Sequence, residues 1–154
     1  MASVNSIQVD AIVAKTNLLP IDRHPKFRLH YFQVAAATVA AADGSTFELG
    51  RLPFGRLRIL RDQSKIWTSA WGSSRVLKFG HRAYAKADGS AEAEDDDAFG
   101  SALDVSSATN ALQMSTGTPY DMFSRTGWDF FATVTGGTFP VGGTLEGYLA
   151  YLHE

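Results

Sequence analysis

Residues 50–80 read GRLPFGRLRILRDQSKIWTSAWGSSRVLKFG and hold the clearest signs of the fold. Two runs in this stretch, residues 56–61 and 75–79, each follow a turn signal made of Pro, Gly or Ser. In the first run Leu57 and Ile59 fall on one face and two arginines on the other, which is the alternation of a half-buried strand. Residues 66–71 are also strand-like, so the stretch predicts a β scaffold without a nucleophile, a paired base or a metal cluster.

Apolar alternation predicts further strands on either side of this stretch. Residues 128–135 place Trp128 and Phe130 on one face, whereas residues 144–152 are largely apolar on both faces. A strand that is apolar on both faces lies at the centre of a sandwich or presents one face to another subunit. Residues 27–38 and 46–49 also read as strands, and the turn Asp43-Gly44 between them favours a hairpin.

Short helical turns are expected between residues 98 and 124. Ser106 or Ser107 would cap a helix over residues 108–113, because a serine hydroxyl can accept from the free amides of a first turn. Thr118 followed by Pro119 would start a second turn that runs through Phe123.

The acidic segment ADGSAEAEDDD, residues 87–97, has no large apolar side chain. It is predicted to be a solvated, mobile loop. Clustered carboxylates are also the ligands that calcium prefers, but their spacing here does not match an EF-hand loop. We therefore expect no tightly bound metal.

Composition narrows the classes of protein to which the chain can belong. Its 154 residues fit one domain, and a hydrophobic content of 45% allows a packed core. The absence of cysteine excludes disulfides and thiolate chemistry, and a net charge of −2 argues against nucleic acid as a partner. Without an apolar run long enough to span a bilayer, the expectation is a protein made in a cytoplasm that has no membrane partner.

Residues that carry catalytic or cofactor chemistry do not form a recognisable pattern. The histidines lack metal-ligand spacing, and no Gly-x-Ser-x-Gly turn occurs. The expectation is therefore a protein that is not an enzyme and has no catalytic residue, metal or cofactor. Trp67, Trp71 and Trp128 could instead stack on sugars, although tryptophans in small β domains usually belong to the core or to an interface.

Residues 1–28 contain apolar side chains without a clean period, and Pro20 and Pro25 separate them from the first strong strand. They form either a packed terminal segment or an arm that binds a neighbour, next to a sandwich domain over residues 29–154. The candidate partner-binding residues combine this segment with the last strand. They are Ile7, Val9, Ile12, Val13, Leu18, Leu19, Arg23, His24, Lys26, Tyr148 and Leu152.

Several short motifs resemble those of tailed-bacteriophage capsid decoration proteins, also called cement or head-stabilising proteins. The motifs are LGRLPFGRLRIL at 49–60, LKFGHRAY at 77–84, FATV at 131–134 and GYLAY at 147–151. The resemblance covers roughly residues 45–152, and residues 1–28 match none of these motifs. It implies a β-sandwich that trimerises on the shell, with the major capsid protein as partner and no catalytic residues to carry over.

The fold class expected from all of these observations is all-β. We expect a single jelly-roll-like β-sandwich with short helical turns and an N-terminal arm. The expected function is a homotrimeric decoration protein on the outer surface of the virion, which binds the assembled head lattice and bridges its major subunits. The alternative is a carbohydrate-binding module, or a virion protein that contacts host glycans.

Overall fold

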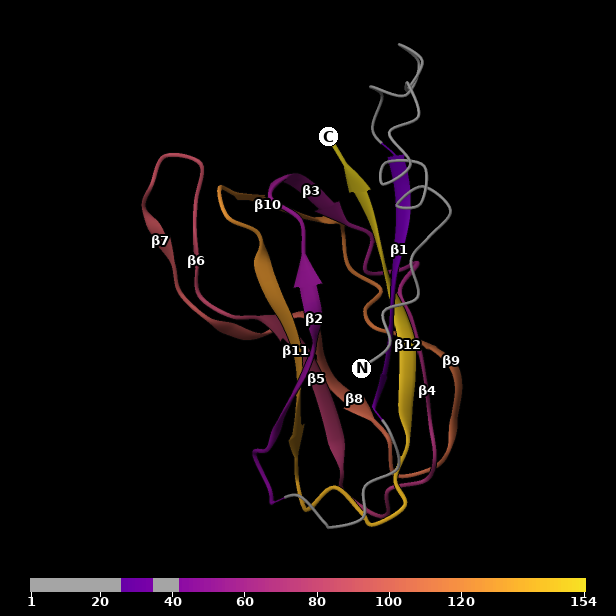
Figure 1. Cartoon of the computed structure of the whole chain (residues 1–154). Helices are drawn as coiled ribbons and strands as arrows, with labels where there is room; N and C mark the ends of the chain where they lie inside the picture. Colours follow the sequence, from indigo (N-terminus) through magenta and orange to yellow (C-terminus); the bar gives the residue numbers. More distant parts are fainter. Residues whose placement is uncertain (1–25, 35–41) are drawn as a thin grey trace.

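The computed structural model describes residues 26–34 and 42–154 of the chain. This part consists of strands in three antiparallel sheets joined by turns and loops (Figure 1). No helix of the described residues is long and apolar enough to cross a bilayer. The strands are β1 (Lys26–Val34), β2 (Thr46–Leu52), β3 (Gly55–Ile59), β4 (Lys65–Thr68), β5 (Val76–His81), β6 (Tyr84–Ala85), β7 (Ala91–Glu92), β8 (Asp95–Asp104), β9 (Thr109–Gln113), β10 (Tyr120–Ser124), β11 (Trp128–Thr135) and β12 (Leu145–His153).

Two larger sheets form the sandwich. One has four strands in the order β2-β11-β5-β8, and the small hairpin β6-β7 stands apart from it. The other has six strands, in the order β10-β3-β12-β4-β9 with β1 also paired to β12. Since β4 pairs with residues 145–148 of β12 and β3 with residues 151–153, these two strands share one edge of β12. The strand β1 pairs with all of β12 and therefore runs along its other edge.

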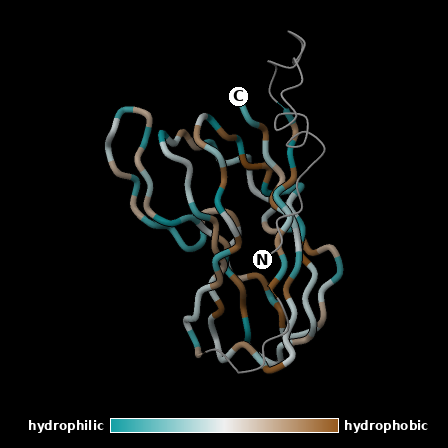
Figure 2. Tube along the Cα trace, viewed as in Figure 1, coloured by the Kyte–Doolittle hydropathy of each residue, from teal (hydrophilic) through white to brown (hydrophobic). Residues whose placement is uncertain are grey.

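The two sheets face each other across an aromatic core. Phe79 and Phe130 of the four-stranded sheet stack with ring centroids 5.8 Å apart, and Phe32 of β1 meets Phe130 at 5.5 Å. All three rings are buried, and each contributes roughly 2–3 kcal/mol of hydrophobic stabilisation. Hydrophobic residues, brown in Figure 2, recur along the strands and alternate with hydrophilic ones. Residue 147 is a glycine because the Phe32 ring lies against it. A Cβ atom at this position would be only 2.7 Å from the Cζ atom of Phe32.

Ser64 supplies a missing hydrogen bond at the point where the pairing of β12 changes from β4 to β3. At this point the Ala150 carbonyl accepts from the Leu60 amide at 2.8 Å, but the Ala150 amide has no facing main-chain carbonyl and donates to Ser64 Oγ at 2.9 Å. The Ser64 hydroxyl in turn donates to the Leu60 carbonyl at 2.9 Å. Because Ser64 is fully buried, water cannot replace its hydroxyl without opening the sheet.

The structure confirms the all-β, jelly-roll-like fold and the position of most strands. β11 covers the residues predicted for it, and β12 is displaced by one residue from the prediction. The predicted hairpin between residues 27–38 and 46–49 is wrong, because β1 pairs with β12 and β2 with β11. The turn at Gly44 instead docks on β11, where its amide donates to the Val134 carbonyl at 2.8 Å.

The two predicted helical turns are wrong, because residues 109–113 form β9 and residues 120–124 form β10. The Thr68 amide donates to Thr109 Oγ1 at 3.0 Å, which fixes the start of β9 on β4. An extra residue in β9 is absorbed by a bulge, with Ala111 at a φ of 56°. Ladder pairing to distant residues therefore overrides the local capping signals.

The acidic segment is likewise more ordered than predicted, since residues 91–92 belong to β7 and residues 95–97 begin β8. The carboxylates of Asp95, Asp96 and Asp97 lie within 4.8 Å of one another, and Lys78 Nζ is 3.1 Å from Asp96. The side-chain hydrogen bond with Asp95, partial desolvation and the charges of Asp95 and Asp96 raise the pKa of Asp97 above its ordinary value. The absence of tight metal binding stays a prediction.

Replacing Ser64 by alanine should destabilise the fold strongly for so small a change. Ser64→Ala leaves the buried Ala150 amide without an acceptor, so we expect the free energy of unfolding to fall by about 1–3 kcal/mol. Urea unfolding followed by tryptophan fluorescence measures this difference.

Ser69 provides the matched control, because its hydroxyl accepts from the Thr144 amide at 3.0 Å at a solvent-exposed point just after β4, whereas Ser64 lies just before β4. Ser69→Ala should reduce the free energy of unfolding much less, since water can satisfy the amide. Equal losses for the two variants would contradict the role assigned to Ser64.

The raised pKa of Asp97 predicts a pH-dependent gain from Asp97→Asn. A group with a raised folded-state pKa lowers stability when it is charged, and that penalty disappears as the pH falls below its unfolded pKa. The variant should therefore raise Tm by about 1–2 °C at pH ~7, and it should not change Tm at pH ~3. The gain is small because solvent screens the charge of an exposed carboxylate. Differential scanning calorimetry at both pH values tests this.

Asp88 is the control for this measurement, because hydrogen bonds from Ser90 lower its pKa. Asp88→Asn should give no gain in Tm at neutral pH. A gain for Asp97→Asn that is the same at both pH values would contradict the electrostatic explanation.

Candidate subunit-binding surface

The register between β1 and β12 places aromatic and aliphatic side chains on the outer face of the six-stranded sheet. Tyr31 stands opposite Tyr148, and Phe27 stands opposite Leu152. Residues paired across two strands project from the same face. The alternate residues of β12, Leu145, Leu149 and Tyr151, are buried in the core, so Tyr148 and Leu152 project outward.

Three aromatic rings continue across this face from β1 to β4. Tyr31 meets Tyr148 edge-on with ring centroids 5.8 Å apart, and Tyr148 meets Trp67 at 5.9 Å. The indole N–H of Trp67 donates to Asn110 Oδ1 at 2.9 Å, which orients the ring. Together with three neighbouring apolar residues these rings form what we call the outer apolar face. It consists of Phe27, Leu29, Tyr31, Trp67, Tyr148 and Leu152.

Two side chains of the outer apolar face remain open to solvent to an unusual degree. Tyr31 is 60% exposed and Phe27 is 48% exposed, although both sit on a regular strand of a large sheet. Tyrosine and tryptophan combine a large apolar area with a polar tip, which makes them the usual anchors of protein interfaces. The chemistry of this surface therefore suits binding to another protein.

Charged residues border the outer apolar face toward β3 and β10. Arg58, which stands opposite Leu152, donates to Asp121 at 2.8 Å. This hydrogen bond raises the pKa of Arg58 and lowers the pKa of Asp121. Exposed ion pairs of this kind contribute little to stability, so their main effect is a polar border with both signs of charge.

The structure brings together only part of the predicted partner-binding set. Tyr148 and Leu152 lie on the outer apolar face, and Lys26 opens β1 opposite His153. The remaining predicted residues lie outside the described residues. They are Ile7, Val9, Ile12, Val13, Leu18, Leu19, Arg23 and His24.

Sequence reasoning missed four residues of this surface: Phe27, Leu29, Tyr31 and Trp67. A signal for the first three was present, because Phe27, Leu29 and Tyr31 are apolar residues of one alternating set in this strand. Which set faces the core became clear only from the facing sheet, because Phe32 packs on Phe130 and Phe79.

The histidines in the described part of the chain hydrogen-bond main-chain carbonyls. His30 pairs with the Leu49 carbonyl at 3.1 Å, His81 Nδ1 with the Arg82 carbonyl at 3.1 Å, and His153 Nε2 with the Phe54 carbonyl at 3.0 Å. In each pair the ring nitrogen donates, so these imidazoles hold loops and strands in place. Burial and the charge of Arg28 lower the pKa of His153.

Two of the three tryptophans considered for sugar stacking are unavailable. Trp71 and Trp128 are buried in the core, and only Trp67 reaches the surface. A planar sugar-stacking platform built from these three residues is therefore excluded.

Comparison with known proteins identifies a shared fold. No family model matches the sequence, and no curated protein sequence matches it. The structure is similar to a chain of the cyanophage Pam1 capsid asymmetric unit, with a TM-score of 0.60 and 15% identity over 100% of both chains. A likeness to the VP2 subviral particle of infectious bursal disease virus has a TM-score of 0.44 at 13% identity, covers 84% of this chain and 33% of VP2, and is too weak to bear on the fold. At such identities the likeness to the cyanophage chain concerns the fold alone.

Proposed function

We propose that this protein is a capsid decoration protein, which binds the assembled head of a bacteriophage on its outer surface and bridges the major capsid subunits. The outer apolar face over β1 and β12 is the observation that carries this proposal. Two further observations support it. The sequence motifs resemble those of decoration proteins, and the fold matches, over the full length of both chains, a chain from a capsid asymmetric unit.

The outer apolar face is proposed as the contact between copies of the chain in a homotrimer. Monomeric proteins rarely leave a contiguous apolar patch of this kind in water, because burying it is favourable. Three copies that turn this face toward a common threefold axis would cover Tyr31 and Phe27 together.

A trimer of this kind would strengthen the head in a simple way. A protein that binds only the assembled lattice stabilises that state by mass action. Linking three binding surfaces in one trimer multiplies weak contacts, because after the first contact the others form at a high effective concentration. The function therefore requires a stable trimer and a segment that reaches the shell.

Residues 1–25 are proposed as the segment that reaches the shell. They precede β1, carry apolar residues such as Ile7, Val9 and Leu18, and end in the basic pair Arg23 and His24. A segment that becomes ordered on binding trades conformational entropy for reach, and its basic end would pair with an acidic surface. Such binding should weaken as the salt concentration rises.

The trimer contact predicts that one charge on the outer apolar face dissociates the protein. Multi-angle light scattering of the native chain at micromolar concentration should give three times the 16.7 kDa of one chain. Tyr31→Glu places a charge at the centre of the contact and should reduce the mass to that of a folded monomer, since Tyr31 is exposed in the single chain.

Val141→Glu is the matched control, because Val141 is 65% exposed but lies in the loop before β12. It should keep the trimer mass. A native protein with a monomer mass, or a Tyr31→Glu variant that stays trimeric, would refute the contact.

The arm proposal predicts that folding and shell binding can be separated. A chain that starts at Lys26 should unfold at nearly the same Tm as the full chain, because all of the strands described above remain. Its co-sedimentation with heads stripped of this protein should drop sharply. Unfolding or aggregation of the truncated chain would instead place residues 1–25 in the core, and unchanged co-sedimentation would exclude them as the contact with the shell.

A further inference from the structure

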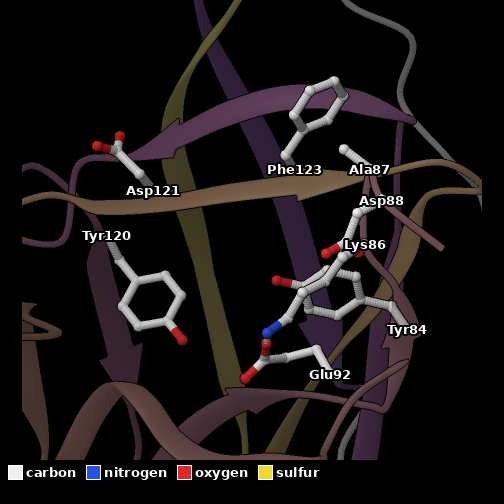
Figure 3. A pocket seen from close by; sticks show the side chains of 8 residues that line it. All are labelled: Tyr84, Lys86, Ala87, Asp88, Glu92, Tyr120, Asp121 and Phe123. Carbon is white, nitrogen blue, oxygen red and sulfur yellow. Dashed lines mark ion pairs between the residues drawn. The ribbon is translucent and has the colours of Figure 1, made fainter. Parts of the chain in front are cut away.

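A hollow of about 390 Å³ lies between the hairpin β6-β7 and the edge strand β10 (Figure 3). The hairpin is tied to the end of β10, where Lys86 forms a bridge with Ser124 and the Arg125 amide donates to the Ala85 carbonyl at 3.0 Å. The volume is in the range of small-molecule sites, roughly 300–1,000 Å³. The hollow is lined by Tyr84, Lys86, Ala87, Asp88, Glu92, Tyr120, Asp121 and Phe123.

Two tyrosines are fixed in the walls of the hollow by packing behind them. The Tyr84 ring meets His81 edge-on at 5.2 Å, and the Tyr120 ring meets Phe99 at 5.4 Å with the planes at 90°. Figure 3 shows both phenol groups turned toward the space between the strands. Burial and the charge of Glu92 raise the pKa of Tyr84 to about 12, so its hydroxyl stays protonated at neutral pH and can both donate and accept.

Phe123 adds an apolar surface at the rim. It is 52% exposed, although it belongs to a regular strand whose inward residue, Met122, is buried. A ring in this position can pack against the C–H groups of a bound molecule. The hollow thus combines aromatic faces with hydroxyl groups.

The charged groups of the hollow are already compensated. Lys86 pairs with Glu92, and Asp121 pairs with Arg58 at 2.8 Å. Asp88 accepts from the hydroxyl of Ser90 at 2.7 Å and from its amide at 2.9 Å. A cationic ligand would compete with Lys86 for Glu92, and an anionic ligand would meet three carboxylates. The hollow therefore favours neither a cationic nor an anionic ligand, and it offers both hydrogen-bond donors and hydrogen-bond acceptors.

From these features we propose that the hollow binds one neutral sugar residue, either free or at the end of a glycan. Every hydroxyl of a sugar is both a donor and an acceptor, and therefore needs partners of both kinds. Lys86 supplies donors, Glu92, Asp88 and Asp121 supply acceptors, and the aromatic rings cover the apolar face of the sugar. This site is different from the surface of three tryptophans considered in the sequence analysis, of which Trp71 and Trp128 are buried.

The hollow shares no residue with the outer apolar face and one residue, Asp121, with its charged border. The hairpin β6-β7 and the strand β1 lie on opposite sides of the molecule (Figure 1), and β3 and β12 stand between β10 and β1 in the sheet. A trimer contact centred on Tyr31 of β1 is therefore separated from the hollow by two strands of the sheet. The sugar site and the capsid function can fail independently of each other.

Titration of the full, isotope-labelled chain tests the proposal. Glucose, galactose, mannose and N-acetylglucosamine are added separately up to tens of millimolar, and amide shifts are followed by NMR. At least one of these sugars should give saturable shifts concentrated in residues 84–92 and 120–124. Phe123→Ala and Tyr84→Phe should each weaken that binding about 2- to 10-fold, because they remove one packing surface or one hydroxyl.

Phe54→Ala provides the control, since Phe54 is 69% exposed but does not line the hollow. It should bind the sugar as the native chain does. The proposal is overturned if none of the four sugars saturates, if both hollow variants bind like the native chain, or if the charged probes choline or glucuronate bind there more tightly than every neutral sugar.

Discussion

The structure depends on β12, a strand whose two faces and two edges are all in use. One edge pairs along its full length with β1, and the other is divided between β4 and β3, with the Ser64 hydroxyl filling the gap between them. Its inner face supplies Leu145, Leu149 and Tyr151 to the core. Because its neighbours come from distant parts of the chain, errors in its register would displace the core and the outer face together.

The same strand connects the fold with the proposed function. Once β12 and β1 are paired, Tyr148 and Tyr31 stand side by side on the outside of the sheet, and the single chain offers nothing among the described residues that fully covers them. Monomeric proteins rarely expose a surface of this kind, which is why we propose it as a contact between copies. At the β10 edge of the same sheet, β10 and the hairpin β6-β7 enclose a polar and aromatic hollow that lies away from the proposed trimer contact.

The sequence predicted correctly those strands in which apolar and polar residues alternate strongly. It failed where pairing with a distant strand decides the local structure. The apolar alternation from Trp128 onward gives β11 directly, and the apolar run over residues 144–152 gives β12 to within one residue. Residues 109–113 carry good capping signals yet form a strand, because Thr109 is held by Thr68 in a ladder that no local window contains. The hollow could not be predicted either, since Tyr84 and Tyr120 meet only after the hairpin docks on β10.

A cryo-electron microscopy reconstruction of the virion would show whether the outer apolar face is the contact between copies on an assembled head. We expect threefold clusters of this chain on the outside of the shell, with β1 and β12 of each copy turned toward the cluster axis and Tyr31 covered. Density in which the outer apolar face of every copy points into solvent, or in which the chain is absent from the shell, would contradict it.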